Sequence, residues 1–225
     1  MITMGEMMSD EIMAQRVALE LSGDCFVNLG IGMPMLVSNH IGTGKQVMFQ
    51  AENGILGVGP RAEPGMEDKD LGNAGDEHVT VSAGASFMDS ATAFDMIRGG
   101  HLDATVLGAF QVSQKGDLAN WKLPGRKLGS YGGAMDLAAG ARKVIVMMKH
   151  VTNDGLPRIV RECSYPLTAK NCVSLIVTDI AVIKVVDDGL ELCETAPGWT
   201  PAQVQQLTEP QLIVRNVSSW PLSVS

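Results

Sequence analysis

Basic side chains and aromatic rings are both in short supply in this sequence. Lysine and arginine number 17 against 25 aspartate and glutamate residues, which gives a net charge of −8, and no basic block occurs. The aromatic residues are five Phe, two Tyr and three Trp. A nucleic-acid-binding surface needs cations that neutralise phosphates and, for single strands, rings that stack on bases. The composition therefore argues against nucleic acid as a partner.

Long apolar runs are absent as well. A stretch such as residues 144–148, Val-Ile-Val-Met-Met, is far shorter than the roughly 20 apolar residues that cross a bilayer as a helix. The N-terminal segment MITMGEMMSD carries acids and lacks the basic start and apolar centre of a signal peptide. We therefore expect no membrane span, no signal peptide and a cytoplasmic location.

Closely spaced metal ligands are also missing. The four cysteines form no CxxC pair, and the four histidines lie far apart in the sequence, so neither set has the spacing of a local metal site. We expect buried free thiols and lone structural or surface histidines, with no metal bound. The residues concerned are Cys25, Cys163, Cys172 and Cys193, and His40, His78, His101 and His150.

Strand and helix patterns alternate through the first two thirds of the chain. Such alternation is typical of an α/β fold with an open, mainly parallel sheet and flanking helices. The segments are predicted helices at 9–21, 34–40, 86–98 and 134–141, and predicted strands at 25–29, 46–49, 79–81, 102–107 and 143–148.

After about residue 157 the pattern changes to short, β-branched segments. We expect strands at 159–160, 173–178, 180–186 and 190–192 and a last helix at 200–207, which makes the C-terminal part richer in β-structure. Residues 57–76, rich in glycine, proline and acids, are predicted to form a long functional loop. No linker-like stretch divides the chain, so we expect one domain over residues 1–225.

The sequence matches two phosphate-binding motifs only in part. Gly42-Thr43-Gly44-Lys45 suggests a P-loop, but Asn39 replaces its first glycine and Gln46 replaces the Ser or Thr that would hold magnesium, so a tight turn is favoured. Gly30-Ile31-Gly32 begins a dinucleotide fingerprint, yet Met35 stands at the third glycine. The GxSxG motif of a nucleophilic serine does not occur.

One carboxylate remains in a context that suggests chemistry. The strand at 46–49 leads to Glu52, followed by Asn53-Gly54 and by further glycines at 57 and 59. Ligands in α/β sheets bind at the carboxyl ends of the strands, and glycines there leave room for a bulky substrate. A structural carboxylate that accepts backbone hydrogen bonds in a tight turn fits the same residues. Taken alone, the segment favours that second interpretation.

The segment around Glu52 also resembles a known signature. Its sequence Gln50-Ala51-Glu52-Asn53-Gly54 is similar to the Ser-Glu-Asn-Gly signature in the beta subunits of the class I (3-oxoacid) CoA-transferases. Alanine at position 51 replaces the usual serine, which keeps the turn and removes one hydroxyl near Glu52. The likeness runs in the same order from about residue 11 to 215. Its other segments are 27–34, 73–75, 97–103, 116–121, 132–137 and 165–168.

This resemblance implies a CoA-transferase-like fold and a covalent mechanism. Glu52 is then the nucleophile, which carries CoA as a glutamyl thioester. Backbone amides of Gly133 and Ala134, in the family's Gly-Gly-Ala motif, are expected to form an oxyanion hole. Weaker candidates for contact with substrate or CoA are Gly30, Gly32, Asn53 and Gly54.

The resemblance further implies the reaction and the partner. We expect transfer of CoA from succinyl-CoA to a 3-oxo acid, either 3-oxoadipate or acetoacetate. Segments 109–113 and 162–166 are more similar to 3-oxoadipate enzymes. Coenzyme A is a substrate here and no cofactor is expected. The chain is expected to act as a beta subunit that needs an alpha subunit. Two other functions stay open, a non-catalytic small-molecule-binding or regulatory α/β domain and an acyl-CoA hydrolase of related fold.

Overall fold

A long mixed sheet organises the molecule. The computed structural model describes residues 5–21, 23–42, 44, 46–125, 129 and 132–221. Within these residues ten strands form one continuous sheet and three short strands form another. The order across the large sheet is β13 (Leu212–Ser219), β12 (Gly189–Thr195), β11 (Ala181–Val186), β10 (Val173–Val177), β8 (Val144–Met147), β5 (Ala104–Leu107), β1 (Cys25–Leu29), β2 (Val47–Ala51), β3 (Ile55–Arg61) and β4 (Val79–Phe87).

The centre of this sheet is parallel. Strands β2, β1, β5, β8 and β10 pair in parallel, whereas β3, β4, β11 and β12 join by antiparallel pairing. Every residue of β5 and β8 is buried. Parallel strands covered on both faces are apolar along their whole length, which explains the unbroken apolar segments in the sequence. The predicted α/β class with a mainly parallel centre is confirmed.

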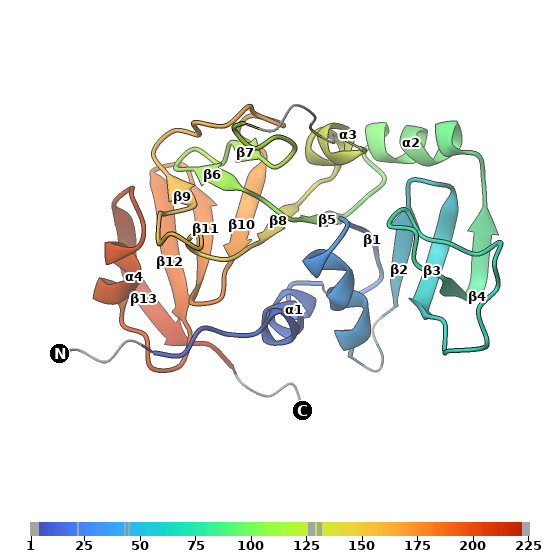
Figure 1. The fold of residues 1–225 in the computed structure, drawn as a ribbon, viewed down its shortest axis with the longest axis horizontal. Coiled ribbons are helices and arrows are strands. Elements are labelled where there is room, and N and C mark those ends of the chain that lie inside the picture. The colour runs from blue at the N-terminus through green and yellow to red at the C-terminus, as the bar shows by residue number, and fades with distance from the viewer. Residues whose placement is uncertain are drawn as a thin grey trace.

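Helices cover both sides of the central strands. Figure 1 shows α2 (Ser90–Arg98) and α3 (Ala134–Gly140) on one side, and α1 (Asp10–Ala18) with the 3-10 helix η1 (Met33–His40) on the other. The Ser9 side chain caps α1 by accepting a hydrogen bond from the Ile12 amide. A full capping box of Thr200 and Gln203 starts α4 (Pro201–Gln206). No helix in the described part of the chain is long and apolar enough to cross a membrane.

Some predicted elements need correction. The loop expected at 57–76 begins only after Arg61, because β3 pairs with β4 as a hairpin despite its glycines. The helix expected at 86–98 starts at Ser90, since β4 continues to Phe87 and Asp89 caps the helix. The helix at Pro34 is a 3-10 helix. In the predicted turn at 42–45, Thr43 and Lys45 lie outside the described residues.

Besides β3, three further strands were not predicted from the sequence. Two of them, β6 (Gln111–Ser113) and β7 (Leu118–Ala119), form the small sheet together with β9 (Ile159–Val160), and the third is β13. The first two are only three and two residues long, too short to show a periodic pattern. The small sheet brings the chain before β9 close to the segment that follows β5.

An ion-pair network fastens α1 to the sheet. The buried Arg16 guanidinium contacts both carboxylate oxygens of Glu194 on β12, at 2.7 and 2.8 Å, and also Glu20 at 2.9 Å. Lys143 contacts Glu20 from the other side at 2.7 Å. Burial alone would raise the pKa of Glu20, but hydrogen bonds and charges from Lys143 and Arg16 outweigh it and lower that pKa.

We expect Arg16→Ala to lower the free energy of unfolding by about 2–4 kcal/mol, because it leaves the partly buried Glu194 without a cation and Glu20 with Lys143 alone. Urea denaturation at pH 7 measures the change. The control is Arg215→Ala, whose exposed pair with Glu191 spans 3.6 Å and contributes under about 1 kcal/mol. The Glu20 contribution is full above pH 4.5, the carboxyl's ordinary pKa, and is lost as pH falls through its lowered folded-state pKa. Equal losses in both variants at pH 7 would contradict this account.

Candidate functional site

Glu52 lies at the carboxyl end of a parallel strand. It follows directly after β2, and the turn behind it is closed by a hydrogen bond from the Gly54 amide to the Ala51 carbonyl, 3.0 Å long. The chain order places β2 on one side of β1 and β5 on the other, so the direction of winding reverses at β1. Ligands of open α/β sheets bind at such a reversal, beyond the carboxyl ends of the strands.

A row of buried polar side chains crosses the sheet beside this carboxylate. The strand register pairs Thr105 with Asn28 and Asn28 with Gln50, and Glu52 lies two residues after Gln50 on the same face. The Asn28 amide nitrogen lies 3.0 Å from Glu52 Oε2 and 2.8 Å from Gln50 Oε1. Gln50 in turn donates to the Ala93 carbonyl of α2, 3.3 Å away. The carboxylate is therefore positioned from the interior of the sheet.

The orientation of the Asn28 amide is determined by its surroundings. Its nitrogen faces three oxygens, two of Gln50 and one of Glu52, and turning the group over would bring oxygen against oxygen. In this orientation Asn28 Oδ1 is buried without a hydrogen-bond partner among the described residues. The neighbouring Thr105 Oγ1 is buried without one as well. Such atoms are uncommon in folded proteins, and both belong to the row of side chains that positions Glu52.

Gly133 brings the start of α3 against the same carboxylate. A Cβ atom placed on Gly133 would lie 3.2 Å from Glu52 Oε1 and 3.4 Å from Cζ of Phe94 on α2. Only glycine allows this approach without displacing its neighbours. Ala134 is the first residue of α3, and the first amides of a helix have no partner within the helix. The structure places Gly133 against Glu52, and the oxyanion role predicted for the amides of Gly133 and Ala134 stays a prediction.

A cavity of about 530 Å³ opens in front of Glu52. That volume is within the usual range for small-molecule sites. Among the residues that line it, Glu52 and Arg158 carry the charges. Glu52 also borders a smaller cavity of about 50 Å³, together with Asn73, Ala74 and Gly75. The larger cavity is lined by Gly30, Ile31, Met33, Glu52, Leu107, Gly108, Ala109, Phe110, Asn120, Leu123, Gly132, Gly133, Ala134, Leu137, Thr152, Arg158 and Tyr165.

The other predicted contact residues divide between this cavity and structural roles. Gly30 lines the cavity. Gly32 begins η1 with a φ of 90° and does not line it. The Asn53 side chain donates to the Gly72 carbonyl at 2.7 Å and ties down the loop after β3.

Gly54 needs a correction. It is buried at a φ of 117°, and a Cβ there would lie 2.0 Å from the Met88 carbonyl oxygen, which occupies the space expected for substrate. Gly57 is similar, since its Cβ would lie 2.9 Å from Ala85. These glycines allow the chain to pack closely rather than leaving an opening.

Sequence reasoning missed Asn28, Gln50 and Arg158 as members of the site. A signal was present for the first two, because an Asn in the middle of a buried strand and a Gln two residues before the key acid must share a face with it. Arg158 gave none. It reaches the cavity only because the small sheet brings the chain before β9 beside the end of β5.

The other nucleophilic and titratable groups do not compete with Glu52. The four cysteines are free thiols as predicted, but each is half-buried and not buried as expected. Burial raises the pKa of Cys163 to about 12 and that of Cys172 to about 11, so both are protonated at neutral pH. His150 is buried between the Thr178 and Thr208 hydroxyls, and burial lowers its pKa to about 3. It is therefore a neutral structural residue.

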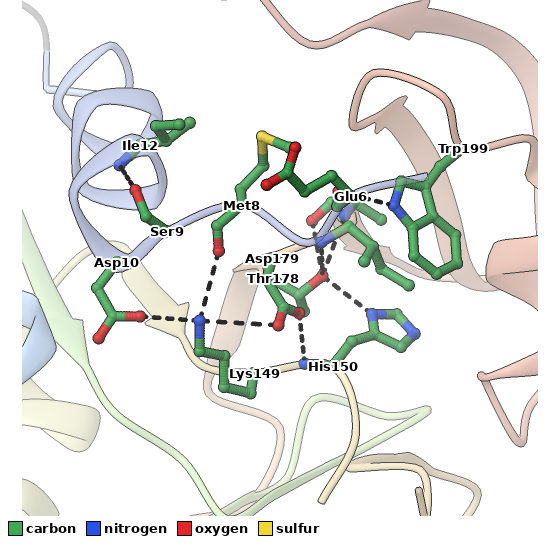
Figure 2. Close-up of polar contacts among 12 residues, drawn as sticks. Glu6, Met8, Ser9, Asp10, Ile12, Lys149, His150, Thr178, Asp179 and Trp199 are labelled. Atoms are coloured by element: carbon green, nitrogen blue, oxygen red, sulfur yellow. Dashed lines mark hydrogen bonds and ion pairs between the residues drawn. The ribbon is translucent and has the colours of Figure 1, made fainter. Parts of the chain in front are cut away.

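A larger cavity, of about 970 Å³, lies between the N-terminal segment and the chain after β8. Figure 2 shows that its lysine, Lys149, is held by groups of the protein itself. The ammonium lies 2.9 Å from Asp10, 3.8 Å from Asp179 and 3.4 Å from the Met8 carbonyl. Because Lys149 has its partners already and Glu52 lies elsewhere, the chemistry belongs to the cavity of about 530 Å³.

The sequence matches the family described as coenzyme A transferase over residues 10–207. The chain belongs to this family. The beta subunit of a 3-oxoadipate CoA-transferase from Pseudomonas putida is 50% identical over 94% of this chain and 100% of its own. The beta subunit of a succinyl-CoA:3-ketoacid coenzyme A transferase from Helicobacter pylori is 47% identical over 91% of this chain and 99% of its own.

Solved structures give the same fold for this coenzyme A transferase. An acyl-CoA transferase from Escherichia coli O157:H7 aligns with a TM-score of 0.77 at 20% identity, over 99% of this chain. The chain spans only 45% of that protein's length. At this identity the likeness shows the α/β architecture alone.

We expect Gly133→Ala to fold normally and to slow CoA transfer about tenfold. The added methyl group would lie 3.2 Å from Glu52 Oε1, so the carboxylate must move by a few tenths of an ångström, and small misplacements of reacting groups are costly. Steady-state rates of the complete enzyme and the thermal unfolding midpoint measure the two effects. Gly42→Ala is the matched control, because nothing lies within 4 Å of its Cβ. An unchanged rate for Gly133→Ala would show that Gly133 leaves Glu52 free to move.

Proposed function

We propose that this chain is the nucleophile-bearing subunit of an enzyme that transfers CoA from succinyl-CoA to a 3-oxo acid. The position of Glu52 carries the proposal. Its carboxylate opens into the cavity, receives the Asn28 amide at 3.0 Å and lies against Gly133 at the start of α3. The printed names of relatives that match nearly the whole chain support the substrate class.

The first half of the reaction loads CoA onto Glu52. A carboxylate oxygen attacks the thioester carbonyl of succinyl-CoA, the C–S bond breaks, and the electron pair leaves with the CoA thiolate. The product at Glu52 is a mixed anhydride with succinate. The thiolate then attacks the glutamyl carbonyl of this anhydride, releases succinate and leaves a thioester between Glu52 and CoA. Anhydride and thioester are close in reactivity, so each step is reversible.

The second half reverses these steps with a different acid. The carboxylate of the 3-oxo acid attacks the glutamyl thioester and expels CoA thiolate, which gives a new anhydride. Attack of the thiolate on the acyl carbonyl forms the 3-oxoacyl-CoA and restores the free Glu52 carboxylate. No net proton transfer is needed, and CoA takes part as a substrate, so the scheme requires neither a metal nor a resident cofactor. Ping-pong kinetics follow.

Each attack places negative charge on a carbonyl oxygen. We assign its stabilisation to the backbone amides of Gly133 and Ala134, two residues that line the cavity at the start of α3. Asn28 has a different part, because its amide holds one oxygen of Glu52 and leaves the other beside Gly133. The nucleophile therefore enters the reaction with a fixed orientation, which lowers the entropic part of the barrier.

A second polypeptide, the alpha subunit, completes the site in this proposal. The relatives at about half identity are named as beta subunits, and the chain spans less than half of the solved acyl-CoA transferase. Large apolar side chains also stand exposed at or near the cavity in the chain. Ile31 lines it and is 67% exposed, Met135 follows the lining residue Ala134 and is 38% exposed, and Leu156 lies two residues before Arg158 and is 63% exposed. We assign these side chains to contact with the alpha subunit, where association would remove them from water.

We expect Glu52→Gln to lower CoA transfer more than about 10⁴-fold while the chain still folds, because an amide oxygen cannot displace the thiolate. Mass spectrometry of the wild-type complex with succinyl-CoA should show a CoA adduct on Glu52, and the variant should show none. An adduct on any other residue would falsify the mechanism.

The shorter Glu52→Asp is the matched control for this test. It keeps the charge and withdraws the carboxylate by one C–C bond, so a loss of ~10²-fold is expected. Wild-type activity in Glu52→Asp would mean that the acid acts only through its charge. Free CoA released without any acceptor acid would indicate a hydrolase instead.

We expect the purified chain to show no transfer of CoA until the alpha subunit is added. Leu156→Asp should weaken the complex about tenfold or more, since it places a charge at an exposed apolar position assigned to the contact with the alpha subunit. Val214→Asp, at a 51% exposed position on β13, should leave association unchanged. Titration of the two proteins against each other, followed by activity and by light scattering, measures both. Full turnover by the chain alone would rule out the two-subunit assignment.

A further inference from the structure

Arg158 stands out as a cation that shares the cavity with Glu52 and has no acidic partner among the described residues. Its one hydrogen bond from the side chain runs to the Ala109 carbonyl at a long 3.5 Å. Of the six other arginines in the described residues, five pair with a carboxylate, and Arg61 lies exposed at the end of β3. The five that pair are Arg16, Arg98, Arg142, Arg161 and Arg215.

The backbone at Arg158 is fixed on both sides. Its amide donates to the His150 carbonyl at 3.1 Å, and its own carbonyl accepts from the Val112 amide at 2.9 Å. Lys149, close by in sequence, is by contrast a cation with partners. Its ammonium group contacts Asp10, Asp179 and the Met8 carbonyl (Figure 2). The backbone of Arg158 is also held by hydrogen bonds, but its guanidinium N–H groups have no acidic acceptor among the described residues.

The charges in the cavity indicate which kind of ligand would bind to Arg158. Glu52 repels an anionic acyl group, and the net charge of −8 gives no general attraction for one. A half-buried guanidinium without a counter-charge costs solvation energy, which a bound anion recovers. Guanidinium and carboxylate groups match in geometry and form paired charge-assisted hydrogen bonds. A carboxylate ligand would therefore satisfy Arg158 and offset the repulsion from Glu52.

We propose that Arg158 binds the distal carboxylate of a dicarboxylic acyl group whose other end reacts at Glu52. This inference rests on the proposed function and names its substrate class, the CoA thioesters and free forms of short dicarboxylic acids. A cavity of about 530 Å³ corresponds to a sphere ~10 Å across, which is large enough for a four- to six-carbon diacid, and both charged residues line it.

The phosphates of CoA are a poorer match for Arg158. When the thioester carbon lies at Glu52, the whole pantetheine arm separates it from the phosphates, and a cavity of this size does not contain that length. The acyl group is the part of the substrate that remains next to the nucleophile. Tyr165 and Thr152 line the same cavity and place hydroxyl groups near the bound acid.

The test compares two donors that differ only at the distal end, succinyl-CoA and butyryl-CoA. With the complex of this chain and its alpha partner, we expect Arg158→Gln to lower kcat/KM for succinyl-CoA about 10²-fold and to change that for butyryl-CoA less than about threefold. Arg158→Lys should recover part of the loss, because it restores the charge without the paired hydrogen bonds. Arg161→Gln, three residues further along and 66% exposed, is the control and should behave as wild type.

The outcomes separate this inference from the proposed function. Equal losses with both donors would overturn the inference, since the guanidinium would then serve CoA or the fold, and so would no loss with either. If the wild-type complex forms no CoA adduct at all, the proposed function fails. Calorimetric titration of wild-type and Arg158→Gln complexes with adipate and with hexanoate then still decides the inference. Adipate binding that is lost in the variant supports it, and equal adipate binding by both contradicts it.

Discussion

The hydrogen bond from Asn28 to Glu52 is the contact on which the site depends. A carboxylate at the end of a strand would normally rotate in solvent, but here one oxygen is held at 3.0 Å by an amide in the interior of the sheet. That amide is fixed in turn by Gln50, and Gln50 by the start of α2. A buried polar chain of this kind rigidifies a structure when its members are satisfied. The exception is Asn28 Oδ1, which has no hydrogen-bond partner among the described residues and belongs to the same amide that holds Glu52.

Three elements of the fold meet at this carboxylate and together determine its surroundings. Strand β1 contributes Asn28, β2 contributes Gln50 and Glu52, and α3 contributes the close approach of Gly133. The ion pair of 2.8 Å between Arg98 and Asp136 ties α2 to α3 at the surface, so the two helices keep one spacing above the sheet. The position of the cavity in front of Glu52 follows from the order of the strands, because the direction of winding reverses at β1.

The sequence was most informative where local and global signals agree. Buried strands such as 25–29 and 143–148, and helices with caps such as Ser9 and Thr200, could be placed within a few residues. The strand at 55–61 could not, because its glycines and proline indicate a loop and only pairing with β4 makes it a strand. Glu52 and Gly133 were found through a family resemblance, whereas Arg158 depends on the pairing of β6 with β9, which two- and three-residue strands do not reveal in advance.

Parallel pairing between distant segments also governs when the site can form. Strand β1 pairs with β2 through a short connection, but its other neighbour, β5, begins only at Ala104, and Gly133 comes later still. Contacts between residues far apart in sequence form slowly, because the intervening chain must first lose its freedom. During synthesis Asn28, Gln50 and Glu52 therefore leave the ribosome long before the strand and helix that enclose them. Until more than half of the protein has been made, these polar side chains therefore remain in contact with water.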